Sequence, residues 1–405
     1  MQIPGLRFLR RKLLSRLVRN LAVALGLFQT LIAHWFWTVA LARPSGGPIA
    51  WLAVALALGA ANGALVPVLQ RARRGQGRVR RPARWYMESG VATLIVGLSV
   101  IASWAAYALF GGAALGLGAP GAAVFQAFRI VSTLFVAAVA GQAIWGFTVG
   151  QRRVEVTTTR VPLPKLHPEL TGLRIAQISD LHIGNRLEAD QLDAMVERTN
   201  ATRSDLIVLT GDIFDFDPRH VDEGARRLAG LRARCGVYAI LGNHDHYVGA
   251  DLVADALARH APNIRLLRDE LVRVPVAEPL YLAGVEDLGG PFFERNLHVP
   301  AIDALADQRP SDGPVVLLVH HPEMFAHAAR RGFPLVLAGH THGGQIALPV
   351  GRRGINLARV MTPLTRGAYQ HESSLLYVNR GIGVGGPAVR IHCNREIAVF
   401  ELEPA

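Results

Sequence analysis

Five short stretches of this chain combine aspartate, histidine and asparagine, whose oxygen and nitrogen atoms bind divalent metal ions. They contain no thiolate, and this donor set favours Mn, Fe, Zn or Mg over a structural zinc or an iron–sulfur cluster. They also hold more ligands than one ion needs. Two ions sharing a carboxylate would use them, and such pairs promote displacement at phosphorus. The stretches are Asp180-Leu181-His182, Gly211-Asp212-Ile213-Phe214-Asp215, Gly242-Asn243-His244-Asp245, His320-His321-Pro322 and Gly339-His340-Thr341-His342-Gly343-Gly344-Gln345.

Each stretch directly follows a short apolar run, and the runs are apolar throughout rather than alternating, which is typical of strands buried on both faces of an α/β core. Ligand sites of open α/β sheets lie at the carboxyl ends of strands, so the five turns are expected to converge. Helices are predicted at Glu188–Thr199 and Glu323–Arg330, and further strands make the later sheet mixed. The five runs are 173–179, 206–210, 237–241, 315–319 and 335–338, and the further strands are 280–284, 375–379 and 396–402.

Spacing within the turns supports convergence. In extended backbone, residues i and i+2 point the same way, so Asp180 with His182, and His340 with His342, each offer two donors to one side. Glycines precede three of the predicted ligands, at 211, 242 and 339. They permit the backbone angles and the close approach that such turns require.

The five motifs, in this order, resemble the calcineurin-like metallophosphoesterase superfamily. The Gly-His-Thr-His-Gly-Gly-Gln form, with Gly-Val-Glu-Asp at 284–287 and Asn-Arg-Gly at 379–381, is similar to the bacterial membrane-associated phosphodiesterase branch. The resemblance covers roughly residues 172–402. It implies an α/β domain at 171–405 made of two packed mixed β-sheets flanked by helices.

Carried over motif by motif, the resemblance implies the roles of the site residues. Asp180, His182 and His342 would bind one metal ion; Asn243, His320 and His340 would bind the second, and Asp212 would bridge them. A metal lowers the pKa of water from 15.7 towards about 7, so a hydroxide would be the nucleophile. His244 would protonate the leaving oxygen or steady the phosphoryl group. Asp245 would orient the imidazole of His244.

Other residues keep alternative interpretations. His321 competes with its neighbour His320, although the His-x-Pro frame favours His320. Asp215 fits a position behind the ligands better than a ligand position. His246 and Tyr247 either line the substrate site or belong to a solvated loop, and Arg380 either contacts a phosphate or lies on the surface. Residues 286–312 and 346–373 are candidate substrate-facing loops.

The first 150 residues have a different composition. They carry 15 Lys or Arg and one acid, Glu88, whereas the rest carries 28 basic and 30 acidic residues and 14 of the 15 histidines. Four runs without Lys, Arg, Asp or Glu are long enough to span a bilayer. A four-helix transmembrane module is therefore predicted, followed by a linker at 151–170 with some extended structure. The runs are about 21–41, 48–69, 91–110 and 130–149.

Basic residues cluster before the first run and at 71–84, whereas the two other connections hold only Arg43 and Arg129. By the positive-inside rule both termini are cytoplasmic. We expect a multi-pass protein of the inner (plasma) membrane with its catalytic domain in the cytoplasm. The basic loops then serve topology and contact anionic lipid, and no nucleic-acid partner is expected. Cleavage after the first span, giving a soluble exported enzyme, would contradict this arrangement.

These features predict a membrane-anchored, binuclear-metal-dependent phosphoesterase that hydrolyses phosphodiester or pyrophosphate bonds with metal-activated hydroxide. Anchorage at the bilayer suggests a lipid-linked phosphate as substrate. The alternative is a non-enzymatic membrane sensor or transporter subunit whose phosphoesterase-like domain only binds a ligand. The intact ligand set argues against that alternative.

Overall fold

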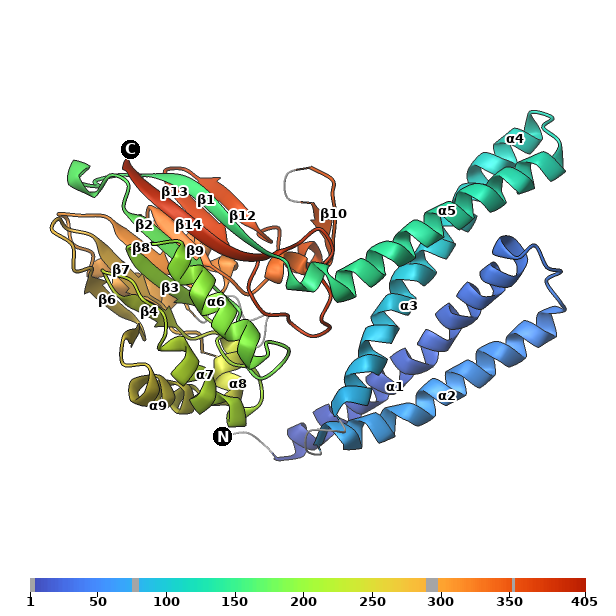
Figure 1. The fold of residues 1–405 in the computed structure, drawn as a ribbon, viewed down its shortest axis with the longest axis horizontal. Helices are drawn as coiled ribbons and strands as arrows, with labels where there is room; N and C mark the ends of the chain where they lie inside the picture. The colour runs from blue at the N-terminus through green and yellow to red at the C-terminus, as the bar shows by residue number, and fades with distance from the viewer. Residues whose placement is uncertain (1–3, 75–79, 289–297, 352–353) are drawn as a thin grey trace. The chain divides into compact units, whose positions relative to one another are not determined.

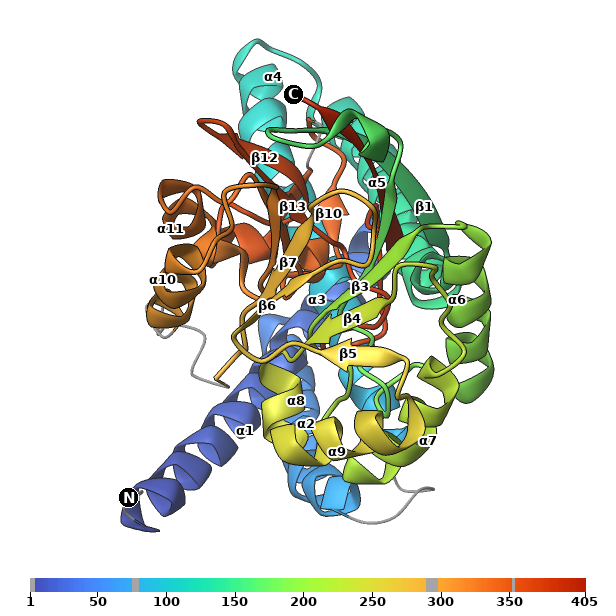
Figure 2. The ribbon, with the colours of Figure 1, turned by 90° about the vertical axis from the view of Figure 1, so that its left-hand side faces the viewer.

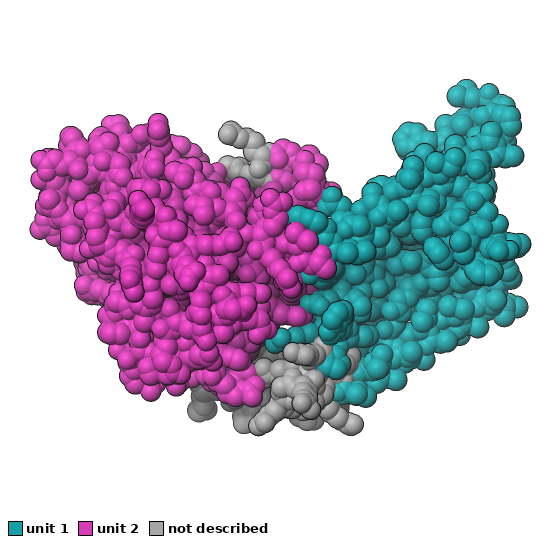
Figure 3. All heavy atoms as spheres, viewed as in Figure 1, with its two compact units in different colours: residues 1–147 teal, residues 148–405 magenta. Residues whose placement is uncertain are grey.

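The computed structural model describes residues 4–74, 80–288, 298–351 and 354–405. The chain divides into two compact units, Met1–Phe147 and Thr148–Ala405 (Figure 3). Arg78 of the basic loop, and parts of both candidate substrate-facing loops, lie outside the described residues. The two units are described separately below.

The first unit is helical (Figure 1). Among its described residues, four helical stretches are long and apolar enough to cross a membrane: Asn20–Ala40, Pro48–Val68, Arg84–Gly116 and Gly121–Arg152. The α-helices are α1 (Pro4–Trp35), α2 (Pro48–Arg74), α3 (Arg80–Ala106), α4 (Gly112–Gly116) and α5 (Gly121–Thr148), and π-helical turns at Phe36–Ala40 and Tyr107–Gly111 extend α1 and α3. The sequence predicts Arg129 in a connection between spans, but α5 begins at Gly121, so Arg129 lies inside a helix. Its Nε donates to the carbonyl of Val39 at 3.0 Å.

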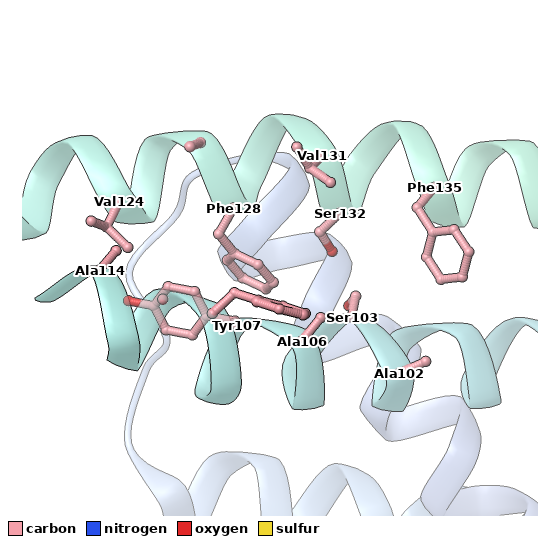
Figure 4. A pocket seen from close by; sticks show the side chains of 13 residues that line it. Ala102, Ser103, Ala106, Tyr107, Ala114, Val124, Phe128, Val131, Ser132 and Phe135 are labelled. Carbon is pink, nitrogen blue, oxygen red and sulfur yellow. The ribbon is translucent and has the colours of Figure 1, made fainter. Parts of the chain in front are cut away.

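An apolar cavity of about 520 Å³ lies between α5 and the stretch from α3 to α4 (Figure 4). Its lining includes Tyr107 and Phe128, whose ring centroids are 4.5 Å apart. One polar member, Ser132, accepts a hydrogen bond from Trp35 Nε1 at 2.8 Å. Ser103 Oγ also donates to the Val100 carbonyl at 2.8 Å, so the cavity is a mostly hydrophobic space with both serine hydroxyls paired, as suits helices packed within lipid.

The second unit contains two six-stranded mixed sheets. The order in the first is β1-β14-β2-β3-β4-β5 and in the second β12-β13-β9-β8-β7-β6. Strands β2 to β5 are parallel, as are β13, β9, β8 and β7. The bounds are β1 Val154–Leu163, β2 Arg174–Ile178, β3 Leu206–Thr210, β4 Val237–Ile240, β5 Ile264–Leu266, β6 Glu270–Arg273, β7 Tyr281–Gly284, β8 Val315–Leu318, β9 Leu335–Ala338, β12 Gly367–His371, β13 Ser374–Val378 and β14 Arg395–Pro404, with a separate hairpin of β10 Ala347–Leu348 and β11 Ile355–Asn356.

The two sheets pack face to face, with helices on their outer faces. Figure 2 shows α6 on one side of the sheets and α10 and α11 on the other. Along β3, Leu206 and Val208 enter the core between the sheets, whereas Ile207 and Leu209 pack under the outer helices. Both faces of the strand are thus buried, which explains its continuous apolar sequence. The helices are α6 Ala189–Ala201, α7 Val221–Leu228, α8 Asn243–Val248, α9 Ala250–His260, α10 Val299–Asp307 and α11 Phe325–Arg330.

The predicted fold class is confirmed: apolar helices precede an α/β domain with two mixed sheets flanked by helices. Strands β3 and β9 have the predicted bounds, and the other ligand-bearing strands differ by a residue or two. The extended structure expected in the 151–170 segment is β1, which pairs with β14 over its whole length and so adds a strand to the first sheet. Its alternating polar residues fit an edge strand with one solvated face.

Candidate metal centre

The carboxyl ends of five strands bring most of the predicted ligands together. Strands β2, β3 and β4 come from one sheet, and β8 and β9 from the other. Two groups of side chains have ligand atoms within 4.8 Å of one another: Asp180 with His182 and His342, and Asp212 with His320 and His340. A further such group joins His182, Asp212 and His244.

The first group is almost fully buried. His182 Nε2 lies 2.9 Å from His342 Nε2, and His342 Nε2 lies 3.5 Å from Asp180 Oδ1. The Asp180 carboxylate also accepts the backbone N–H of His340, at 3.0 Å to Oδ1. Asp180 therefore ties the turn after β2 to the turn after β9 while presenting an oxygen to the imidazoles.

The second group has a defined histidine orientation. His320 Nδ1 lies 2.9 Å from the carbonyl of Thr210. Because a carbonyl only accepts, Nδ1 carries the proton, and Nε2 keeps its lone pair for a metal. That Nε2 lies 3.3 Å from Asp212 Oδ2 and 3.2 Å from His340 Nδ1.

Asp212 belongs to the second group and also lies close to the first. Its Oδ2 is 3.3 Å from His320 Nε2 and 3.6 Å from His182 Nε2. Burial opposes ionisation, but the charges of His320 and His182 outweigh it and hold the pKa of Asp212 well below its usual range. An ionised carboxylate between two sets of imidazoles has the position that a bridging ligand requires.

Several histidines are held neutral. Burial and the neighbouring histidines lower the pKa of His340 and of His342 well below its usual range. Burial also acts against a charged His320, yet the carboxylates of Asp212 and Asp180 raise its pKa. Metal ligands must be unprotonated imidazoles. The neutral rings of His340 and His342 and the ionised Asp212 are ready donors for divalent cations, whereas a metal ion bound by His320 would have to displace a proton.

Five of the seven predicted ligands have left-handed backbone. The φ angles are 51° at Asp180, 48° at His182, 52° at Asp212, 71° at His340 and 50° at His342. The expectation that these residues have extended backbone was therefore wrong, although Asp180 and His182 do lie in the same ligand group. Positive φ is uncommon outside glycine, and such strain concentrates at functional sites. The tight turns, rather than strand geometry, aim these side chains.

Close backbone approach explains two of the glycines. A Cβ on Gly242 would meet the backbone nitrogen and Oδ1 of Asp212, and one on Gly339 would meet Ser179 Oγ and Asp180 Oδ2. Neither glycine has a positive φ, so what they contribute is space. Asn243 directly follows Gly242 as the first residue of α8. Its buried Oδ1 has no hydrogen-bond partner among the described residues.

The assignment of Asp245 needs correction. Its carboxylate does not contact the His244 imidazole but accepts the backbone N–H groups of Ile213, Phe214 and Gly242 at 2.8–3.1 Å. Asp245 is the third residue of α8, so its side chain turns back to the helix start. It holds the backbone of two ligand turns together, and burial together with the charge of Asp212 raises its pKa to about 7.

Asp215 contacts His244 instead. Its Oδ1 lies 2.7 Å from His244 Nδ1 and 3.6 Å from His182 Nδ1. Burial opposes ionisation of Asp215, but its hydrogen bonds with these two histidines lower its pKa to about 2. A carboxylate only accepts, so His244 Nδ1 is the protonated nitrogen. Asp215 thus orients His244 from behind the ligand groups, the position expected for it.

The structure gives contacts for the residues whose roles the sequence left open. His321 Nε2 lies 2.8 Å from Asp287 Oδ2, with His298 beside it, and the His321 ring packs against that of His340 with centroids 3.9 Å apart. His246 lies 3.5 Å from Glu286. Arg380 is bound by Glu155 and Glu396, each at 2.9 Å, so its charge is already balanced. Sequence reasoning missed Asp287 and His298, and the Gly-Val-Glu-Asp motif was the available signal for Asp287.

The residues present fit two divalent ions. Imidazole nitrogens and carboxylate oxygens converge in two neighbouring groups, and the Asn243 oxygen adds a buried acceptor with no protein donor among the described residues. Nitrogen and oxygen donors of this kind suit borderline and hard divalent metals.

Comparison with known proteins agrees with this chemistry. A family model described as calcineurin-like phosphoesterase matches residues 173–344. A metallophosphoesterase of Campylobacter jejuni is 30% identical over 250 residues, covering 62% of this chain and 63% of that protein. A transmembrane protein with metallophosphoesterase domain from Danio rerio is 30% identical over 270 residues, covering 65% and 60%.

A third relative is matched over almost its own full length. The metallophosphoesterase YkuE of Bacillus subtilis is 31% identical over 292 residues, covering 68% of this chain and 96% of that protein. The chain spans only about 60% of the length of the Campylobacter and zebrafish relatives. The shared part contains the ligand turns described above. This chain therefore belongs to the calcineurin-like metallophosphoesterase family.

Proposed function

We propose that the protein uses two divalent metal ions to hydrolyse phosphodiester or pyrophosphate bonds of a membrane-associated substrate. Asp180, His182 and His342 would hold one ion, Asn243, His320 and His340 the other, and Asp212 would bridge them. The position of Asp212 carries this proposal, because one of its oxygens lies within 3.6 Å of a histidine from each group. When bound, the ions supply a hydroxide at neutral pH and positive charge for the phosphoryl oxygens.

The residues of the chain supply positioning and proton transfer. Asp215 fixes the protonated Nδ1 of His244, which leaves Nε2 to face the leaving oxygen. The His244 side chain is 21% exposed, so substrate can reach it. To donate a proton from Nε2 to the leaving oxygen, His244 must carry hydrogen on both ring nitrogens, and the Asp215 carboxylate that accepts from Nδ1 stabilises this charged ring. Asp245 keeps the turns after β3 and β4 at a fixed separation.

Turnover of a chromogenic phosphodiester by the full chain in lipid nanodiscs, with added Mn²⁺, tests the assignment. In Asp212→Asn, turnover should fall by about a thousandfold or more, since a bridging charge is lost, and bound metal should fall from two ions per chain. Asp217→Asn is the matched control, because Asp217 lies on the same loop and binds the exposed Arg219. Full turnover with two bound ions in Asp212→Asn would reject the bridging role.

We further propose that the first unit spans the plasma membrane several times with the second unit in the cytoplasm. The four apolar helices and the position of the basic residues support this topology. Reporter fusions at the C-terminus test it: green fluorescent protein should fluoresce, and alkaline phosphatase should be inactive. The reverse pattern would overturn the orientation.

Membrane anchorage favours a lipid-linked phosphate as substrate. We expect a higher kcat/KM for a phosphodiester or pyrophosphate on a lipid in the same nanodisc than for a water-soluble ester. Activity confined to water-soluble esters would remove the lipid from the proposal and leave the hydrolase in place. Mn²⁺, Fe²⁺, Zn²⁺ and Mg²⁺ added to metal-free protein would identify the supporting ion.

A further inference from the structure

The hairpin that follows the last ligand turn has large apolar side chains on its exposed face and an asparagine on its buried face. Strand β10 pairs with β11, so that Ala347 lies opposite Asn356, and Leu348 opposite Ile355. Ala347 and Asn356 are buried, whereas Leu348 is 62% and Ile355 is 47% exposed. A hairpin in water normally turns its apolar residues inward and its polar residues outward. The outer face of this hairpin is therefore suited to a non-aqueous environment.

Further exposed apolar residues lie close to the two hairpin strands in sequence. Val350 and Met361 are exposed, and Val360 is 85% exposed. We call these five residues, Leu348, Val350, Ile355, Val360 and Met361, the hairpin surface. Clustered apolar side chains of this size on a soluble domain mark interaction sites.

The charge of the segment narrows the choice of partner. The sequence has no acidic residue between Glu323 and Glu372, and the exposed Arg359 lies next to Val360. Apolar side chains combined with basic ones and no acids match the interface of an anionic bilayer. Five side chains are far fewer than the roughly 20–30 residues per partner of a stable protein interface. Contact with the surface of a bilayer does not require a protein interface of that size.

The hairpin is attached firmly to the candidate metal centre. Gln345 ends the Gly-His-Thr-His-Gly-Gly-Gln motif, and β10 begins two residues later. Thr365 accepts through its carbonyl from Thr341 Oγ1 at 2.6 Å, and its own Oγ1 lies 3.3 Å from Asn356 Nδ2. Ala347 also donates to the Ile391 carbonyl at 2.9 Å. These hydrogen bonds join the buried side of the hairpin to the turn that carries His340 and His342.

We propose that the hairpin surface docks into the interface of the bilayer in which the first unit is anchored, and so holds the metal centre at the level of the lipid headgroups. The inference rests on the proposed membrane anchorage. It adds a second membrane contact, made by the catalytic unit itself. The substrate class that fits is a phosphoester whose phosphate lies at the headgroup level.

Fluorescence quenching in nanodiscs tests this directly. The two native cysteines, Cys235 and Cys393, are buried, so a bimane label goes to an introduced cysteine. In the full chain carrying Val350→Cys, in phosphatidylcholine–phosphatidylglycerol nanodiscs, doxyl-labelled lipid should quench the probe and aqueous iodide should not. Leu252→Cys on α9 is the control, because Leu252 is an exposed leucine distant in sequence from the hairpin. A bimane at position 252 should be quenched by aqueous iodide and not by doxyl-labelled lipid.

A second variant separates docking from catalysis. Adding Leu348→Glu and Ile355→Glu should abolish doxyl quenching at position 350 and leave hydrolysis of a water-soluble diester within about twofold of the parent, since neither residue lies in the metal centre. Iodide quenching without doxyl quenching at position 350 in the parent would show a water-facing hairpin. Quenching by neither would show a protein partner, such as the helices of this chain or of a second copy. Either result overturns the proposal. If the parent showed no turnover at all, the hydrolase assignment would be in question, but the quenching result would still test whether the hairpin surface contacts lipid.

Discussion

Asp215→Asn removes the charge that orients the proposed proton donor without changing the size of the side chain. In the structure, Asp215 is ionised, with a pKa of about 2, and its Oδ1 lies 2.7 Å from His244 Nδ1. Asparagine still offers an oxygen, but it neither stabilises a positive imidazole nor prevents the amide N–H₂ from facing Nδ1. His244 would then spend time in an orientation or tautomer that cannot protonate the leaving oxygen.

The size of the effect follows from the role of such partners. Loss of a group that orients a metal or catalytic histidine typically costs about 10- to 100-fold in activity or metal affinity. A 10- to 100-fold loss corresponds to about 1.4–2.7 kcal/mol in the activation free energy. Asp215 also lies 3.6 Å from His182 Nδ1, so part of the loss could come from weaker metal binding.

A Mn²⁺ titration separates these two causes. We expect kcat on a soluble phosphodiester to fall by about 10- to 100-fold at saturating Mn²⁺, with KM nearly unchanged, and Asp217→Asn to behave like the parent. Restoration of kcat by excess Mn²⁺ would show that Asp215 acts on His182 and not on His244. A loss below about threefold at saturation would refute the orienting role altogether.

Three further predictions follow from single contacts. Gly242→Ala should destabilise the second unit by about 1–3 kcal/mol and lower turnover, because its Cβ would meet Asp212, and thermal unfolding and kinetics measure both effects. Glu396→Gln should lower the free energy of unfolding by about 3–5 kcal/mol at pH 7. Burial opposes ionisation of Glu396, but Arg380 lowers its pKa, so the stability difference between parent and variant is present above about pH 4.3 and disappears as the pH falls through the folded-state pKa. Denaturant unfolding of both proteins at pH 7 and at a pH below that pKa measures the difference. His320→Ala should lose bound metal and nearly all turnover, whereas His321→Ala, which faces Asp287, should keep both metals; elemental analysis distinguishes them.

The strands and the ligand turns were predictable because the signal is local. Leu206–Thr210 and Leu335–Ala338 are apolar throughout, and burial on both faces of a sheet is the ordinary reason for such runs. The polar residues after each run then fall at one edge of the sheets. Topology was enough to bring Asp180, Asp212 and His342 together.

The aim of individual side chains was not predictable in the same way. Asp180 and His340 have left-handed φ in turns that follow strands of different sheets, and the His340 N–H joins these turns by donating to Asp180 Oδ1. Proximity in sequence also misled the assignment of Asp245, which lies beside His244 but turns back to Gly242. The signal was present: an acidic residue three positions after a helix start commonly binds the backbone there.

The origin of the ligands predicts that metal binding stabilises the packing of the two sheets. Each proposed ion takes ligands from both: Asp180 and His182 follow β2 of one sheet, whereas His342 follows β9 of the other. A ligand at 100 times its dissociation constant stabilises the folded state by about 2.7 kcal/mol, or roughly 5–10 °C for a domain of this size. Cys235 and Cys393 are buried in the second unit, so a thiol-reactive dye reports the unfolding of that unit in the full chain. Addition of Mn²⁺ should raise this transition in the parent and in Asp217→Asn but not in Asp212→Asn. An equal rise in all three would mean that the metal does not join the sheets through Asp212.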